Sequence, residues 1–271
     1  MTLFDPDGVE PPAGPRGPLV RVRLTVAYVG TGFHGFAANP GVRTVGGVLA
    51  DAVGRILGHP VVLTCAGRTD TGVHAWGQVV HFDTSWPAAN LDLAALQRSL
   101  NKLAGSALVV RDAALAPPGF DARRSATGRT YRYLVLNRPL PDPFLAPTTW
   151  HVEQPLDLRA MAMACDPLIG EHDFTSFCRR APDQAADAPL TRVVRDAHWT
   201  DDGKAVLRFE IEASAFCHQM VRSLVGTLVA VGRGRLRAGD VAGILRAGDR
   251  SKAAQPAPAH GLCLWAVTYP A

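Results

Sequence analysis

Apolar and polar residues alternate with a period of two along several stretches of the chain, and this pattern predicts half-buried β-strands. The first stretch is "LVRVRLTVAY", which begins at Leu19. Short apolar runs bounded by glycine or polar residues predict further strands. These runs lie at residues 61–65, 77–82, 107–115, 129–137, 191–199, 204–213 and 261–269.

Between the strands, apolar residues recur every three or four positions, which is typical of amphipathic helices. The pattern is clear over residues 45–57, where Thr44 is a candidate N-cap. Further helices are predicted at residues 91–103, 157–170, 216–231 and 241–245. Because strands and helices occur together in both halves of the chain, we expect two α+β lobes, each with a sheet backed by helices.

Two proline-containing stretches, residues 116–120 and 137–147, are candidate boundaries between these lobes. We therefore expect an N-terminal lobe over residues 19–116 and a C-terminal lobe over residues 117–271. Residues 1–18 are rich in proline and contain no apolar core of a secretory signal, so we expect a disordered tail.

Composition excludes some classes of protein and weakly favours others. The chain of 271 residues is 47% hydrophobic and 19% charged, as in ordinary globular proteins. It has no long uncharged apolar stretch that predicts a transmembrane helix. The five cysteines are scattered and form no CxxC pair, which favours a reduced, cytoplasmic protein with structural thiols. A net charge of +4 slightly favours a polyanionic partner.

The loop "GRTDTG" between two predicted strands contains Asp70, a charged residue in an otherwise apolar setting. Arg222 is its counterpart, because it is the only formally charged residue from Ala213 to Gly232, within a helix that is apolar or small on nearly every face. An unpaired buried charge is costly. We therefore predict that Asp70 and Arg222 pair, which would hold the carboxylate ionised.

Each of these two residues also has a simpler interpretation. Asp70 is followed by Thr-Gly, which is ordinary turn chemistry. Arg222 could extend its guanidinium to the surface at a domain edge. The triplet Asp70-Thr71-Gly72 also occurs in aspartic proteases, but those enzymes need a second carboxylate that shares a proton, and this chain has a single copy of the triplet.

Aromatic and basic residues alternate in "GRTYRYLV", which contains Arg129, Tyr131 and Arg132. Such a strand can stack bases and hold phosphates, although cross-strand packing explains the pattern equally well. No nucleotide-binding glycine motif is present. His34, His74 and His81 match no metal-ligand spacing, so we interpret them as structural residues with hydrogen-bond partners.

Four long segments, taken in order, closely resemble those of the TruA-type tRNA pseudouridine synthases. They are "AGRTDTGVHAWGQVVHF", "FDARRSATGRTYRY", "GEHDFTSFC" and "FCHQMVRSLVGTLVAVG", and the closing "HGLCLWAVTY" fits as well. The resemblance runs from about Leu19 to Tyr269. It departs at Phe36-Ala37, where relatives commonly carry Trp-Gln, at Thr71, where they often have Ala, and in the segment after Phe177.

This resemblance implies a pseudouridine synthase fold of two lobes with mainly antiparallel sheets and an active-site cleft between them, usually in a homodimer. It implies isomerisation of uridine to pseudouridine at positions 38, 39 and 40 of the tRNA anticodon stem-loop, without cofactor or metal. Asp70 would be the catalytic aspartate, Arg222 its partner, Arg68 the residue that helps displace the target nucleotide, and Tyr131 the residue packed on the uracil. Matching residues in the second segment would bind RNA: Phe120, Asp121, Ala122, Arg123 and Arg124. A non-catalytic RNA-binding protein on the same fold is the alternative.

Overall fold

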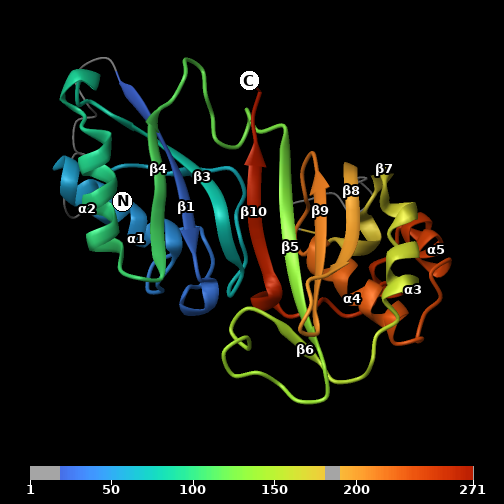
Figure 1. Cartoon of the computed structure of the whole chain (residues 1–271). Coiled ribbons are helices and arrows are strands. Elements are labelled where there is room, and N and C mark those ends of the chain that lie inside the picture. Colours follow the sequence, from blue (N-terminus) through green and yellow to red (C-terminus); the bar gives the residue numbers. More distant parts are fainter. Residues whose placement is uncertain (1–18, 181–189, 271) are drawn as a thin grey trace, which may run out of the picture.

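A computed structural model describes residues 19–180 and 190–270, and its main feature is one large β-sheet with helices packed on it (Figure 1). The predicted tail at residues 1–18, and most of the divergent segment after Phe177, lie outside the described residues. The strands are β1 (Val20–Tyr28), β2 (Thr64–Cys65), β3 (His74–Thr84), β4 (Leu108–Leu115), β5 (Gly128–Asn137), β6 (Trp150–Val152), β7 (Gly170–Asp173), β8 (Thr191–Asp201), β9 (Val206–Ala213) and β10 (Leu262–Thr268). The helices are α1 (Val45–Leu57), α2 (Leu93–Ala104), α3 (Leu158–Met163), α4 (Met220–Gly232) and α5 (Asp240–Ala247).

The strand order is β4-β1-β3-β10-β5-β9-β8-β7, with β2 paired to β3 and β6 paired to β5. The last strand, β10, lies between the two halves: it is parallel to β3 and antiparallel to β5. The α+β class predicted from the pattern is therefore confirmed. One detail differs from the expectation of a separate sheet in each lobe, because the insertion of β10 makes the sheet continuous.

Two apolar cores lie along this sheet. One is built by α1 and α2 against β1 and β3, and the other by α4, β8 and β9. The helices accordingly form two groups at opposite ends of the sheet in Figure 1. Tyr131 of β5 packs against both cores, so it marks the place where they meet. The predicted boundary after residue 116 falls between β4 and β5, and the division into two domains stays a prediction.

Local sequence explains where most helices begin and end. The side chain of Thr44 accepts a hydrogen bond from the backbone N–H of Gly47, so the predicted N-cap of α1 is confirmed. Helix α3 is shorter than predicted: it ends at Met163, four residues before Pro167, which has no N–H to donate to the carbonyl of residue 163. Helix α4 begins at Met220 rather than at residue 216, because Gln219 has a left-handed backbone with φ of 63°.

Candidate active site

Asp70 lies in the loop between β2 and β3. The end of β1 and the loop that follows it hold this loop in place. Thr69 is 7% exposed, and its hydroxyl shares a 2.8 Å hydrogen bond with the hydroxyl of Tyr28. The backbone at Gly35 passes so close that a Cβ there would lie 2.9 Å from the Thr69 carbonyl oxygen. Because Thr69 is buried and fixed, the next residue projects its carboxylate outward, with 31% of that side chain exposed.

Two basic side chains face the carboxylate, one on each oxygen. Arg222 Nη1 lies 3.6 Å from Asp70 Oδ2, and His218 Nε2 lies 3.4 Å from Asp70 Oδ1. The predicted pairing of Asp70 with Arg222 is thus confirmed. A cation lies beside the aspartate, whereas an aspartic protease needs a second carboxylate there to share a proton.

The guanidinium of Arg222 is held from its other side by the segment that precedes β10. Its Nε donates a 2.8 Å hydrogen bond to the carbonyl of Ala257, whose own N–H donates to the carbonyl of Arg222. Helix α4 can approach this segment because Gly226 has no side chain: a Cβ there would lie 2.0 Å from the carbonyl oxygen of Gln255. Arg222 is therefore a fixed, 18% exposed cation rather than an arginine extended into solvent.

Tyr131 supplies an aromatic wall at the same place. Its ring meets Phe216 edge to face, with 5.0 Å between the ring centroids. Burial raises the pKa of the Tyr131 phenol above its ordinary value, and the negative charge of Asp70 raises it further. The phenol consequently keeps its proton at neutral pH.

The remaining predicted residues are divided between surface and interior. Arg68 is exposed near the start of the Asp70 loop, and it has no hydrogen bond or ion pair to other residues that the structure describes. Phe120 and Ala122 are buried, and the side chain of Asp121 accepts hydrogen bonds from the backbone N–H groups of the next two residues. Those two residues, Arg123 and Arg124, have exposed side chains. Of the predicted RNA-binding segment, only these two arginines offer positive charge to a partner.

The side chains of Arg129 and Arg132 bind other parts of the protein. The alternation of aromatic and basic residues on this strand therefore reflects contacts within the fold. Arg129 is 9% exposed and donates to four carbonyl groups, including those of Ala66 and Arg123. It thereby ties the predicted RNA-binding segment to the start of the Asp70 loop. Arg132 pairs with Glu210 and stacks on the ring of Trp265. Cross-strand packing is thus the correct interpretation for Arg132, whereas Arg129 is a buried arginine bound to carbonyl groups, which neither interpretation predicted.

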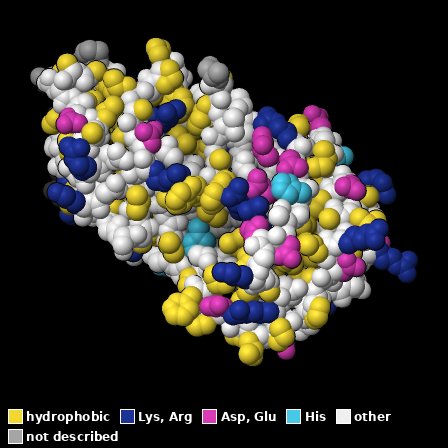
Figure 2. All heavy atoms as spheres, in the orientation of Figure 1, with side chains coloured by type: hydrophobic (Ala, Val, Ile, Leu, Met, Phe, Trp, Pro, Cys, Tyr) yellow, Lys and Arg dark blue, Asp and Glu magenta, His cyan; other side chains and the backbone are white. Residues whose placement is uncertain are grey.

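Arg132 belongs to a row of stacked side chains that comes from four strands of the sheet, two of which, β4 and β3, have β1 between them. Arg111 lies over the ring of Trp76, Trp76 stacks on Trp265 at 5.8 Å, and Trp265 carries Arg132. Figure 2 shows basic and hydrophobic groups side by side across the middle of the molecule, as such a row produces. The row joins β4, β3, β10 and β5, so it stiffens the sheet where the two halves meet.

Two of the three histidines predicted to be structural have side-chain partners, whereas the side chain of His34 is exposed and forms no hydrogen bond with the residues that the structure describes. His74 accepts a hydrogen bond at Nδ1 from the N–H of Gly30, so its Nε2 carries the proton and donates to the carbonyls of Pro147 and His260. His81 accepts from the N–H of Ala122. Burial lowers the pKa of both histidines, which keeps them neutral.

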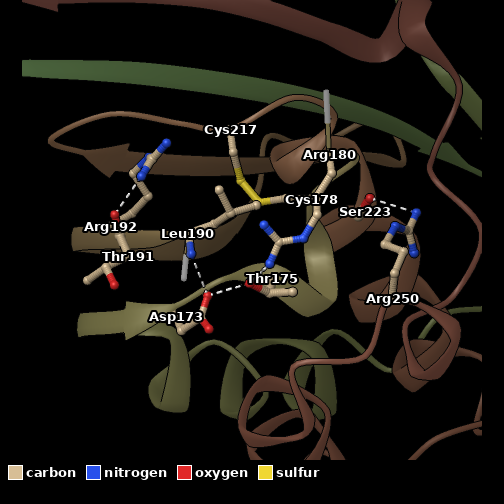
Figure 3. Close-up of a disulfide and its surroundings, with 10 residues drawn as sticks. All are labelled: Asp173, Thr175, Cys178, Arg180, Leu190, Thr191, Arg192, Cys217, Ser223 and Arg250. Atoms are coloured by element: carbon tan, nitrogen blue, oxygen red, sulfur yellow. Dashed lines mark hydrogen bonds between the residues drawn. A yellow bond between two sulfur atoms is a disulfide. The ribbon is translucent and has the colours of Figure 1, made fainter. Parts of the chain in front are cut away.

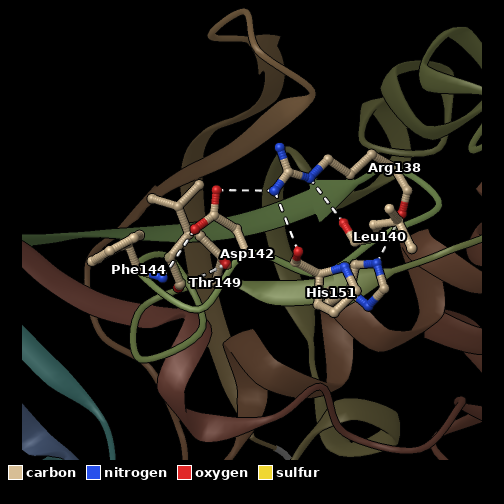
Figure 4. Close-up of polar contacts among 8 residues, drawn as sticks. Arg138, Leu140, Asp142, Phe144, Thr149 and His151 are labelled. Atoms are coloured by element: carbon tan, nitrogen blue, oxygen red, sulfur yellow. Dashed lines mark hydrogen bonds and ion pairs between the residues drawn. The ribbon is translucent and has the colours of Figure 1, made fainter.

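Pro147 ends a braced loop between β5 and β6, shown in Figure 4. Arg138 donates to Asp142 at 2.9 Å, and Asp142 accepts from the N–H of Phe144. His151 closes the base of the loop on the carbonyl of Arg138. These contacts hold the loop in place where it touches His74. His74 lies four residues after Asp70 in the sequence.

A disulfide joins Cys178 and Cys217, whose Cα atoms lie 5.7 Å apart (Figure 3). This pair contradicts the expectation that all the cysteines are thiols. Tertiary contacts bring the two segments together, since the N–H of Arg179 donates to the carbonyl of His218. The other cysteines are thiols, and burial raises the pKa of Cys65 to about 11, which suits a structural role.

His218 lies one turn before Arg222 in the sequence, which left open either a place beside the same site or a packing role, and no sequence signal singled out Phe216. Both lie in the segment ahead of α4, whereas the helical pattern had placed them on the helix itself.

Within residues 19–180 and 190–270, no cluster of histidine, cysteine, aspartate or glutamate side chains could hold a metal ion. In those same ranges, every helix is too short or too polar to cross a membrane.

Comparison with known proteins agrees with the geometry. Residues 164–270 match the family described as tRNA pseudouridine synthase. The chain is 46% identical over 254 residues to tRNA pseudouridine synthase A of Frankia casuarinae, covering 93% of this chain and 90% of that protein. It is 39% identical over 250 residues to the enzyme of the same name from Syntrophotalea carbinolica, covering 92% and 96%.

Among solved structures, an H/ACA RNP bound to a substrate RNA containing 2'-deoxyuridine aligns with a TM-score of 0.34 at 13% identity, covering 77% of this chain and 43% of that one. This likeness is too low to support an inference. The identities to full-length relatives are high and extend over nearly all of both chains. The chain therefore belongs to the tRNA pseudouridine synthase A family.

Proposed function

We propose that this protein isomerises uridine to pseudouridine in tRNA, with Asp70 as the reacting carboxylate. The observation that carries the proposal is the setting of Asp70: a partly exposed carboxylate on a fixed loop, with Arg222 3.6 Å away and Tyr131 nearby. Membership of the tRNA pseudouridine synthase A family supports the substrate and the reaction.

The reaction breaks the bond between N1 of uracil and C1′ of ribose, rotates the base and joins C5 to C1′. C5 loses a proton and N1 gains one. A carboxylate serves this chemistry either as a nucleophile or as a base toward the ribose, and the Arg222 guanidinium lies 3.6 Å from Oδ2 as its counter-charge. Tyr131 keeps its proton at neutral pH, which suits a wall against the uracil better than a base for C5.

The target nucleotide has to leave its stack before Asp70 can reach it, at a cost of roughly a few kcal/mol. We propose that Arg68, which is exposed and without a partner among the described residues, offsets part of this cost by occupying the vacated space. Arg123 and Arg124 would bind phosphates of the anticodon stem-loop, so that the affinity for tRNA falls as salt is added. The modified positions would be 38, 39 and 40, which mapping of the product on tRNA would test.

We also propose that the protein works in the cytoplasm as a homodimer. The sequence resemblance to the TruA-type enzymes supports the dimer, and a tRNA substrate supports the compartment. Sedimentation of the purified protein as a monomer would contradict the first part of this proposal.

The test of the catalytic role is tritium release from tRNA labelled at C5 of uracil, with the wild type, Asp70→Asn and Asp51→Asn compared. Asp51 is an exposed residue of α1 and serves as the matched control. We expect release by the wild type and the control, and none by Asp70→Asn, although that variant still binds tRNA. Release by Asp70→Asn close to the wild-type rate would refute the role of Asp70 and favour a non-catalytic function for this residue.

A further inference from the structure

We propose that His218 is a positioning residue, which orients the carboxylate of Asp70 by donating a hydrogen bond from Nε2 to Oδ1. The inference rests on the proposed function of Asp70. Its basis is the 3.4 Å separation between these two atoms, together with the fact that Arg222 takes the other oxygen. The sequence pattern assigned no role to this histidine.

A carboxylate with a single partner can still rotate about the bond that joins it to Cβ. When separate donors face Oδ1 and Oδ2, the plane of the carboxylate is defined, and so is the direction of the lone pairs that reach the substrate. Both separations exceed the length of a typical charge-assisted hydrogen bond, as is common for catalytic groups before the substrate binds.

The two partners lie on different sides of Asp70. The Arg222 side chain is 18% exposed and is held against the carbonyl of Ala257, whereas the His218 side chain is 45% exposed. Arg222 thus supports the carboxylate from the interior, and His218 from the open side where a nucleotide would enter. Removal of His218 should therefore affect the orientation of Asp70 more than its charge.

The backbone that carries His218 is held at three successive residues. Phe216 packs on Tyr131, Cys217 forms the disulfide with Cys178, and the carbonyl of His218 accepts from the N–H of Arg179. The left-handed conformation of Gln219 then turns the chain into α4, which carries Arg222. A side chain mounted on such a fixed segment can hold a reacting group in one geometry, which is what a positioning role requires.

The test compares His218→Leu, which fills the space without a donor, with His218→Gln, whose amide nitrogen can replace Nε2. The matched control is His198→Leu, because His198 is also 45% exposed and also contacts an aspartate, Asp196, but lies on β8 outside the proposed site. Initial rates of tritium release are measured over a range of tRNA concentrations, with melting temperatures for every variant. The wild type and Asp70→Asn are run alongside.

We expect His218→Leu to lower kcat about 10- to 100-fold, the cost of a misplaced reacting group. KM should change little, and His218→Gln should restore most of kcat. His198→Leu should match the wild type, and the melting temperatures should be alike. A rise in KM at constant kcat would overturn the proposal, because it would mean that His218 contacts RNA. A glutamine variant no faster than the leucine variant, or a leucine variant as fast as the wild type, would overturn it too.

These failures are distinct from a failure of the proposed function. If Asp70→Asn is inactive while His218→Leu is fully active, only the positioning role is wrong. If Asp70→Asn is as active as the wild type, the role of Asp70 is wrong, and His218 has no carboxylate to position.

Discussion

At the scale of single residues, the candidate site is a carboxylate supported by groups from distant parts of the chain. Asp70 comes from a loop between two strands, Arg222 from helix α4, and Tyr131 from strand β5. None of these contacts is local in sequence. The Asp70 side chain is only partly exposed, and the Arg222 guanidinium 3.6 Å away gives it a counter-charge.

We predict that Arg222→Ala weakens the fold as well as the reaction. The substitution leaves Asp70 without its cation and the carbonyl of Ala257 without its donor, so the free energy of unfolding should fall by about 1–3 kcal/mol. Urea titration measures this change, and Arg235→Ala is the control, since Arg235 is an exposed arginine just beyond the same helix. An unchanged unfolding midpoint together with an unchanged rate would mean that the pair has no structural or catalytic weight.

At the scale of elements, helix α4 matters because it brings Arg222 against the segment before β10. This contact depends on Gly226, where the helix and the backbone of Gln255 touch. The local pattern predicts an apolar helix here, but it does not say which backbone the helix meets.

We predict that Gly226→Ala destabilises the protein by about 1–3 kcal/mol, because the added methyl group would lie 2.0 Å from a carbonyl oxygen that must move away. The control is Gly243→Ala in helix α5, where a Cβ meets nothing within 4 Å. That control should gain up to about 1 kcal/mol from the better helix propensity of alanine. Thermal unfolding measures the change in stability of both variants. Equal effects of the two substitutions would exclude a clash at residue 226.

At the scale of the whole molecule, β10 makes one sheet of two halves, and the tyrosines on or beside this sheet are buried or partly buried. The chain has four tyrosines, Tyr28, Tyr131, Tyr133 and Tyr269. Burial raises the pKa of every one of them above the ordinary value of 10.0. The folded protein therefore holds these protons more tightly than the unfolded chain does.

This difference predicts the behaviour in alkali. Below about pH 10 the phenols are protonated in both states, and their contribution to stability is complete. As the pH rises above 10, the unfolded chain loses these protons first, so the free energy of unfolding should decrease. Melting temperatures between pH 8 and pH 11.5 measure the decrease, and phenolate absorbance should appear together with unfolding. Phenolate formation at pH 10 in a protein that remains folded would contradict this prediction.

Local pattern was a good guide where neighbouring residues decide the outcome. The strand β1 and the cap of α1 are both set by periodicity and short-range hydrogen bonds. The pair Asp70–Arg222 was also predictable, because two isolated charges in apolar surroundings need each other. Arg129 was harder to interpret, since an arginine that binds carbonyl groups has the same sequence pattern as one that binds phosphates.

The sequence by itself determined most of the helices and strands, the family resemblance and the need of Asp70 for a cation. Those features follow from periodicity, from long ordered motifs and from the cost of an unpaired buried charge. Only the tertiary structure decided that β10 joins the halves, that Cys178 meets Cys217 and that His218 faces the second oxygen of Asp70. These are contacts between segments far apart in the chain, and their geometry depends on how whole elements pack.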